Sequence, residues 1–371
     1  MRFPEFSEEW ERITLYDVIK IQGGYAFKSE EFQKNGVPII RISNLPQNTS
    51  TVNLKDCVYY DDCKLSNFEI SNGDLLIAMS GATTGKTAVY RDNRIAYLNQ
   101  RVGCFKIKDE SKLFYPYLYA LVDTKVFRGQ LVTKLIAGAQ PNISPSDIET
   151  IKISVPILGE QRKIANLMSL LDDRIATQIK IIEDLKKLKS AIRAKVFKQL
   201  ESSCECWSEI GNMLQYEQPS KYLVTSTEYS DSYTTPVLTA NKAFILGYTD
   251  EEFGIYSKGE CVIFDDFTMD VKYVNFPFKV KSSAIKILTA NSGNDLYFVY
   301  EYLQNLGLVS EEHKRHYISE IEPMVVACPT FEEQQNISNL LRSFDSKIEC
   351  ANRKLILYNK QKQHLLSQMF I

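Results

Sequence analysis

The sequence predicts an α+β protein in which two mixed α/β heads are separated by two long helices that pair as an antiparallel coiled coil, with pseudo-two-fold symmetry. Three observations predict this fold: a tandem repeat with a period of 173 residues, a heptad pattern after each copy, and short strand-like runs before each copy. The repeat opens at Pro156 with Pro-Ile-Leu-Gly-Glu-Gln and returns at Pro329 with Pro-Thr-Phe-Glu-Glu-Gln. Two related halves in one chain indicate a pseudo-symmetric molecule.

The chain divides into four segments in this interpretation. The heads are residues 1–155 and 201–328, and the helical segments are residues 156–200 and 329–371. Short β-rich runs separated by Gly and Asn turns predict the strands of both heads. These runs are residues 37–42, 74–79 and 102–107 in the first head and residues 236–239, 259–264 and 284–288 in the second. A helix is expected at residues 115–132 in the first head and at 295–306 in the second.

The two helical segments carry the same heptad register. Alternating steps of four and three residues trace an apolar seam, whose members are Ile164, Met168, Leu171, Ile175, Ile182 and Leu185 in the first segment and Ile337, Leu341, Phe344, Ile348 and Leu355 in the second. Lys189 and Lys362 interrupt both seams at the same layer, and a polar residue at a seam position commonly fixes alignment. We expect the helices to pack on each other antiparallel in a rod of roughly 60 Å.

Composition excludes several classes of protein. A chain of 371 residues with 44% apolar residues can bury the cores of two or three domains. It has no uninterrupted apolar run of membrane-spanning length, and its N-terminus lacks the pattern of a signal peptide, so we expect a cytoplasmic protein without a membrane partner. Eight cysteines without CxxC spacing predict reduced thiols, and three histidines argue against a His/Cys metal site.

Charge is unevenly distributed along the chain. The net charge is −2, yet residues 156–200 carry ten basic against five acidic side chains, and residues 201–328 carry nine against nineteen. Nonspecific DNA affinity comes from many Lys and Arg contacts to phosphate, so the chain is not a generic polyanion binder. The basic excess of the first helical segment either faces DNA or keeps the rod in solution, and the sequence leaves both open.

Several motifs of the first head stand in a characteristic order. They are Gly23-Gly24-Tyr25, Pro38-Ile39-Ile40-Arg41, Ser80-Gly81-Ala82-Thr83, Asn99-Gln100-Arg101 and Gln140-Pro141-Asn142. Together with the repeat and the two heads, they resemble the specificity subunit of type I restriction-modification systems over essentially the whole chain. The second head is similar through Pro236-Val237-Leu238, Asp265-Asp266 and Lys281-Ser282-Ser283, but it lacks the Ser-Gly-Ala-Thr loop and the Asn-Gln-Arg run.

The resemblance implies a non-catalytic subunit with two target-recognition domains. Each head would read one half of an asymmetric, bipartite double-stranded DNA target, and the coiled coil would set the spacer and dock two methyltransferase subunits. Endonuclease/translocase subunits would join for restriction. The resemblance places S-adenosylmethionine, ATP and Mg on the partner subunits and no cofactor in this chain, which lacks Asn-Pro-Pro-Tyr and Rossmann glycine motifs.

The candidate DNA contacts are side chains that can read base edges or hold phosphate. In the first head they are Ser43, Asn44, Ser80, Thr83, Thr84, Lys86, Asn99, Gln100, Arg101, Gln140 and Asn142. In the second head they are Thr239, Asn241, Lys242, Asp266, Thr268, Ser282, Ser283, Lys314 and Arg315. Taken alone, the Asn-Gln-Arg run also fits a solvated loop, and Lys314 with Arg315 also fits an exposed charge run.

Some of these motifs also allow other interpretations. The loop from Ser80 to Thr87 resembles a phosphate-binding loop, but it has three residues between its glycines instead of four and is followed by a strand pattern. Asp265 and Asp266 fit a metal pair less well than a turn or a base-contacting loop, because no third ligand accompanies them. A helical-rod scaffold with protein-binding heads is the main alternative function, and a self-contained enzyme lacks a nucleophile, metal set or cofactor loop.

Overall fold

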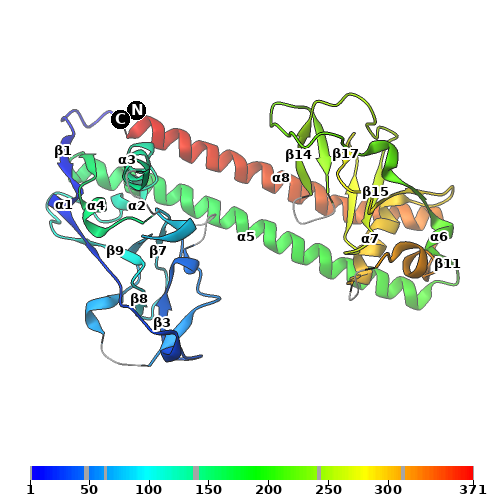
Figure 1. The fold of residues 1–371 in the computed structure, drawn as a ribbon, viewed down its shortest axis with the longest axis horizontal. Helices are drawn as coiled ribbons and strands as arrows, with labels where there is room; N and C mark the ends of the chain where they lie inside the picture. Colours follow the sequence, from blue (N-terminus) through cyan, green and yellow to red (C-terminus); the bar gives the residue numbers. More distant parts are fainter. Residues whose placement is uncertain are drawn as a thin grey trace. The chain divides into compact units, whose positions relative to one another are not determined.

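The computed structural model describes residues 2–45, 50–61, 65–136, 142–239, 244–310 and 314–370. The chain forms two compact units, of which unit 1 contains Met1–Lys180 with Arg353–Ile371 and unit 2 contains Ile181–Asn352. Each unit combines one mixed α/β head with a segment of each long helix, and the segments run antiparallel (Figure 1). The predicted fold class is therefore confirmed.

The head of unit 1 contains two four-stranded sheets. The first sheet is antiparallel and has the order β2 (Ile19–Gln22), β9 (Val102–Ile107), β6 (Leu75–Ala78) and β7 (Thr87–Val89). The second sheet has the order β4 (Val58–Tyr60), β3 (Val37–Ile40), β8 (Ala96–Leu98) and β5 (Glu69–Ile70), with β3 and β8 parallel. Ile40, Leu76, Leu98 and Cys104 are fully buried in one cluster that joins the two sheets. A ribbon of β1 (Glu11–Thr14) and β10 (Lys152–Val155) closes the head.

Short helices cover the other face of the first sheet. They are α1 (Leu15–Val18), α2 (Tyr117–Leu121), α3 (Lys125–Ile136) and α4 (Pro145–Glu149). The single helix predicted at residues 115–132 is wrong, because the chain breaks between α2 and α3. Thr124 causes the break: its hydroxyl donates to the carbonyl of Leu121 and accepts from the backbone N–H of Phe127, as an N-cap does.

The head of unit 2 repeats this architecture. Its first sheet has the order β12 (Leu214–Glu217), β18 (Ile285–Ala290), β15 (Cys261–Asp265) and β16 (Val271–Val274). Its second sheet has the order β14 (Ile245–Thr249), β13 (Thr235–Leu238) and β17 (Lys279–Val280), with β13 and β17 parallel. The closing ribbon is β11 (Trp207–Glu209) with β19 (Val325–Ala327), next to α6 (Ile210–Met213). The predicted helix near 295–306 is α7 (Leu296–Leu306), and Asp295 caps it by accepting from the N–H of Phe298.

The long helices are α5 (Leu158–Ser203) and α8 (Phe331–Met369). Of the predicted seam, six members are buried and five are partly buried: Ile164, Met168, Leu171, Ile182, Leu341 and Phe344, then Ile175, Leu185, Ile337, Ile348 and Leu355. Beyond the predicted seam members, Phe197 of α5 is buried in the core of unit 2, and Leu366 of α8 is buried in the core of unit 1.

A glutamine of the repeat fastens each head to the start of its helix. The side chain of Gln161 accepts from the N–H of Phe114 at 2.8 Å and donates to the carbonyls of Lys112 and Pro156 at 2.8 and 2.7 Å. Gln334 accepts from the N–H of Asp295 at 2.8 Å and donates to the carbonyl of Pro329 at 2.9 Å. Both side chains are buried. The Glu-Gln pair that made the repeat visible therefore has a structural role in each copy.

Candidate nucleic-acid interface

In unit 1 the predicted contact loops meet at one end of the first sheet. Strands β6 and β9 pair so that Ala78 faces Val102, which places the loop after β6 beside the turn before β9. Met79 joins three segments there: its N–H donates to the carbonyl of Arg101, and its carbonyl accepts from the N–H of Ile143, both at 2.9 Å. The Ser80 loop, the Asn-Gln-Arg turn and Asn142 are therefore neighbours.

The glycine-rich turn at Gly23 and Gly24 lies against the same site. The N–H of Gln100 donates to the carbonyl of Tyr25 at 2.8 Å, and the N–H of Asn99 donates to that of Ile40 at 3.0 Å. A Cβ on Gly24 would lie 2.1 Å from the carbonyl oxygen of Asn99, so only glycine permits this close approach. The Asn-Gln-Arg turn is thus held from two sides by backbone contacts that leave its side chains outside the sheet.

The candidates of unit 1 differ in side-chain exposure. Ser43, Gln100, Arg101 and Asn142 are exposed, while Ser80, Thr83, Thr84, Lys86 and Asn99 are half-buried. The buried side chain of Asn44 is engaged within the loop, since it accepts from the N–H of Arg41 and donates to the carbonyl of Asn53, both at 3.0 Å. Gln140 lies outside the described residues.

The loop after β6 is a hairpin connection and not a phosphate-binding loop. Residues Gly81–Thr83 form one turn of 3-10 helix, Gly81 and Gly85 have positive φ, and strand β7 follows directly. The hydroxyls of Ser80 and Thr83 are buried without a hydrogen-bond partner among the described residues. Buried hydroxyls in proteins are normally hydrogen-bonded, so a water molecule or a bound ligand is the expected partner of these two.

Unit 2 has the same backbone connections with different side chains. Asp266 follows β15 as Met79 follows β6: its N–H donates to the carbonyl of Ala284, and its carbonyl accepts from the N–H of His316, both at 3.0 Å. The turn of Lys281, Ser282 and Ser283 precedes β18 in the place that the Asn-Gln-Arg turn has before β9. The two heads therefore present different side chains on one framework.

The acidic pair of unit 2 organises this framework. The buried carboxylate of Asp266 accepts from the N–H groups of His316 and Tyr317 at 3.1 and 2.9 Å and lies 3.6 Å from the Lys286 ammonium. Asp265 accepts from the N–H groups of Phe267 and Thr268 at 2.7 and 2.8 Å. Both carboxylates therefore accept backbone N–H groups, as aspartates in turns do. Within the described ranges, no group of three or more His, Cys, Asp or Glu side chains could hold a metal ion.

The remaining candidate DNA contacts of unit 2 differ in the exposure of their side chains. Thr268, Ser283, Lys314 and Arg315 are exposed, and Thr239 and Ser282 are half-buried. Asn241 and Lys242 lie outside the described residues. Lys281 is not among the predicted contacts, but it is exposed in the turn that corresponds to the Asn-Gln-Arg turn, next to the predicted Ser282 and Ser283.

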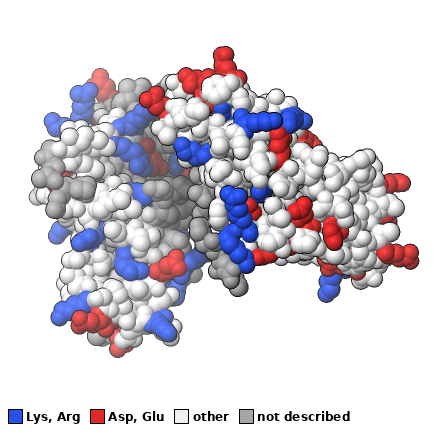
Figure 2. Space-filling view, turned by 45° about the vertical axis from the view of Figure 1, so that its right-hand side comes forward, with Lys and Arg blue, Asp and Glu red and all other residues white. Residues whose placement is uncertain are grey.

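Charged side chains of both signs lie on the face of the molecule that Figure 2 draws. Figure 2 shows Lys and Arg side chains scattered among Asp and Glu, without a face of one sign in that view. In unit 1 a cleft of about 680 Å³ is lined by Lys86, Arg91 and Arg128, but also by Asp172 and Asp173. Attraction to a polyanion must therefore depend on a few local cations, as the net charge of −2 already indicated.

Comparison with known families decides what these heads are. A model of the type I restriction modification DNA specificity domain matches residues 7–187 and again residues 207–357. The chain belongs to this family. Each match contains one head and the N-terminal part of the long helix that follows it. The two copies of the specificity domain therefore correspond to the two halves of the repeat.

Individual specificity subunits are similar to this chain. A type I restriction enzyme specificity subunit of Escherichia coli is 40% identical over 176 residues, which is 44% of this chain and 44% of that protein. A candidate specificity subunit of Methanocaldococcus jannaschii is 24% identical over 98% of this chain and 93% of its own length. The crystal structure of the S subunit from M. genitalium matches the fold with a TM-score of 0.62 at 16% identity, covering 100% and 99% of the two chains.

In the described part of the chain, no helix combines the length and the apolar character that crossing a bilayer requires.

Proposed function

We infer that this chain is the DNA sequence-recognition subunit of a type I restriction-modification complex. Membership of the specificity-domain family supports recognition of DNA and does not favour the alternative of a scaffold with protein-binding heads. Specificity subunits of these systems are non-catalytic, so the chemistry belongs to methyltransferase and restriction partners. The observation that carries the inference is the shared loop framework of the two heads, which displays one set of side chains in unit 1 and another in unit 2.

Two different heads on one chain suit a bipartite, asymmetric DNA target. Direct readout in the major groove uses Asn or Gln against adenine and Arg against guanine, and Asn99, Gln100 and Arg101 present these groups together. In unit 2 the equivalent turn presents Lys281, Ser282 and Ser283 instead, so its half-site differs. The helix pair would set the spacer between the two half-sites.

The stoichiometry and cofactors are part of the same proposal. Two copies of the repeat support docking of two methyltransferase subunits, one for each half-site, with endonuclease/translocase subunits joining for restriction. S-adenosylmethionine, ATP and Mg would then be bound by those partners. This chain would contribute recognition and spacing to the complex.

Methylome sequencing tests this function in cells that carry the chain with its methyltransferase partner. The expected result is a split motif that disappears when the gene is deleted. Arg101→Ala in unit 1 should relax one half of the motif by about 1–3 kcal/mol of discrimination, and Arg315→Ala in unit 2 is the matched change for the other half. A scaffold would leave no split motif in any of these cells, and that result would overturn the assignment.

A further inference from the structure

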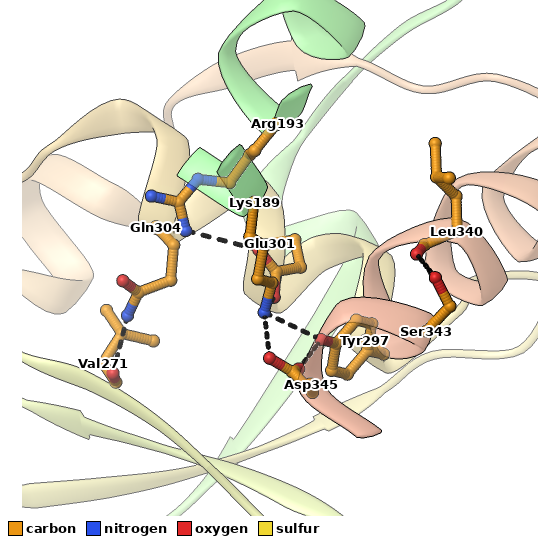
Figure 3. A network of polar contacts seen from close by, with 9 residues as sticks. All are labelled: Lys189, Arg193, Val271, Tyr297, Glu301, Gln304, Leu340, Ser343 and Asp345. Atoms are coloured by element: carbon orange, nitrogen blue, oxygen red, sulfur yellow. Dashed lines mark hydrogen bonds and ion pairs between the residues drawn. The ribbon is translucent and has the colours of Figure 1, made fainter. Parts of the chain in front are cut away.

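Each unit buries a lysine of one long helix between a carboxylate of the other long helix and a carboxylate of the head. In unit 2 the Lys189 ammonium of α5 lies 2.6 Å from Glu301 of α7 and 2.6 Å from Asp345 of α8 (Figure 3). It also donates to the hydroxyl of Tyr297 at 3.1 Å. In unit 1 the Lys362 ammonium of α8 lies 2.7 Å from Asp172 of α5 and 3.0 Å from Asp123.

The two lysine clusters are built from the repeat. Lys189 and Lys362 have the same place in the two copies, as do Asp172 and Asp345, and each lysine binds the aspartate of the other helix. Both ion pairs fall in one antiparallel register, since 17 residues separate Asp172 from Lys189 on α5 and 17 separate Asp345 from Lys362 on α8.

The third carboxylate of each cluster comes from a head and is not part of the repeat. Asp123 lies between α2 and α3 of the first head, whereas Glu301 lies within α7 of the second. An arginine supports each of them, at 2.7 Å from Arg128 to Asp123 and at 3.3 Å from Arg193 to Glu301. Different segments of the two heads have thus supplied a carboxylate to the same lysine position.

Burial makes these contacts selective for one register. The side chains of Lys189 and Lys362 are 13% and 10% exposed, whereas Asp345 and Asp172 are 46% and 31% exposed. Loss of the helix carboxylate would leave each buried lysine with its head carboxylate alone, which is destabilising. If one helix slipped by a heptad, Lys189 would face residue 338 or 352, a serine or an asparagine. Lys362 would face residue 165 or 179, an alanine or an isoleucine. Either slip removes the helix carboxylate from both lysines at once.

We propose that Lys189 and Lys362 are positioning residues that select the register of the helix pair and seat each head upon it. The proposal rests on the function inferred above, because the register controls the spacing of the half-sites. A heptad slip moves one helix by roughly 10 Å, which is roughly three base pairs of B-DNA at about 3.4 Å each. Loss of the lysine clusters therefore predicts tolerance of spacers that differ from the native spacer by about three base pairs.

The test uses the full chain with its methyltransferase partner in cells, and a library of targets whose spacer is varied one base pair at a time. Wild type should methylate one spacer length. Lys189→Met and Lys362→Met should each raise methylation of the targets with altered spacers about tenfold relative to the native spacer. Lys189→Arg keeps the charge and should restore the wild-type profile, and the matched control Lys187→Met changes an exposed lysine of α5 and should leave it unchanged.

A second variant keeps the test decisive if the single substitutions do not fold. Lys189→Met and Arg193→Met combined with Glu301→Gln and Asp345→Asn removes all four charges of the cluster together, so that none of them is stranded. This variant should stay folded and still accept altered spacers. A folded variant that keeps the wild-type spacer profile would overturn the role of the lysines. The absence of a split motif in wild type would instead overturn the proposed function.

Discussion

Replacing Gln161 with leucine should destabilise unit 1 through the loss of the three hydrogen bonds that this buried side chain makes. Leucine fills a similar volume, but it leaves the N–H of Phe114 and the carbonyls of Lys112 and Pro156 without a partner. At about 1 kcal/mol for each bond the loss is about 3 kcal/mol. Gln334→Leu removes two bonds of normal length and should cost unit 2 about 2 kcal/mol.

Thermal unfolding combined with hydrogen exchange measures both losses. A change of about 3 kcal/mol lowers the Tm of a domain of roughly 150–250 residues by roughly 6–12 °C. The amide of Phe114 should lose protection in Gln161→Leu and keep it in Gln334→Leu, while the amide of Asp295 should show the reverse. Gln335→Leu, at an exposed position beside Gln334, is the control and should change neither amide. If Gln161→Leu kept the wild-type Tm and the wild-type protection of the Phe114 amide, the Gln161 side chain would not be what holds the head to the start of α5.

Two further predictions concern the loops. Gly24→Ala should disturb the Asn99 turn, because its Cβ would lie 2.1 Å from a backbone oxygen, and should therefore abolish reading of one half-site. Gly23→Ala is the control, since its Cβ would have open space around it, and should leave that half-site unchanged. A methylome of each variant measures both outcomes. Burial favours a higher pKa for Glu251, but hydrogen bonds from Lys279, Thr225 and Ser226 lower its pKa to about 2. The contribution of Glu251 to stability is therefore complete above pH 4.5 and is lost as the pH falls towards 2. The difference in unfolding free energy between wild type and Glu251→Gln should shrink over that range. A difference that stays constant with pH would contradict the ion pair.

The parts of the fold that could be predicted from sequence are those set by the pattern of apolar residues. The seam of α5 and α8 follows from a heptad pattern, and the strands at Leu75 and Val102 follow from short continuous apolar runs, because most of their residues are buried on both faces. The break between α2 and α3 could not be predicted in the same way. It depends on one hydroxyl at Thr124 that bonds to the backbone on both sides, and an isolated threonine has no periodic signature.

The candidate site was harder to predict than the fold, since polar residues of similar type have opposite roles. Asn44 and Asn99 both lie in the motifs of the first head, yet the Asn44 side chain is buried in bonds to its own loop while the Asn99 turn is held by its backbone. Asp266 is a predicted contact residue, but its carboxylate accepts the backbone N–H groups of His316 and Tyr317. Sequence shows which side chains can read a base, but loop geometry decides which of them are available.

The repeat itself explains why the two heads could diverge while the molecule kept one architecture. The residues retained in both copies, such as the Gln161 and Gln334 pair and the Lys189 and Lys362 pair, make their bonds to backbone groups or to each other's helix. Bonds to backbone do not depend on the neighbouring side chain, so the head sequence can change around Phe114 or Asp295 without loss of the fastening. Each lysine cluster also needs a carboxylate from the head within ion-pair distance of the lysine. Asp123 and Glu301 provide this carboxylate from different segments of the two heads. A head grafted in place of residues 1–155 should therefore be accepted when it brings such a carboxylate, and Asp123→Asn in the native head should weaken its seating as a head without one would.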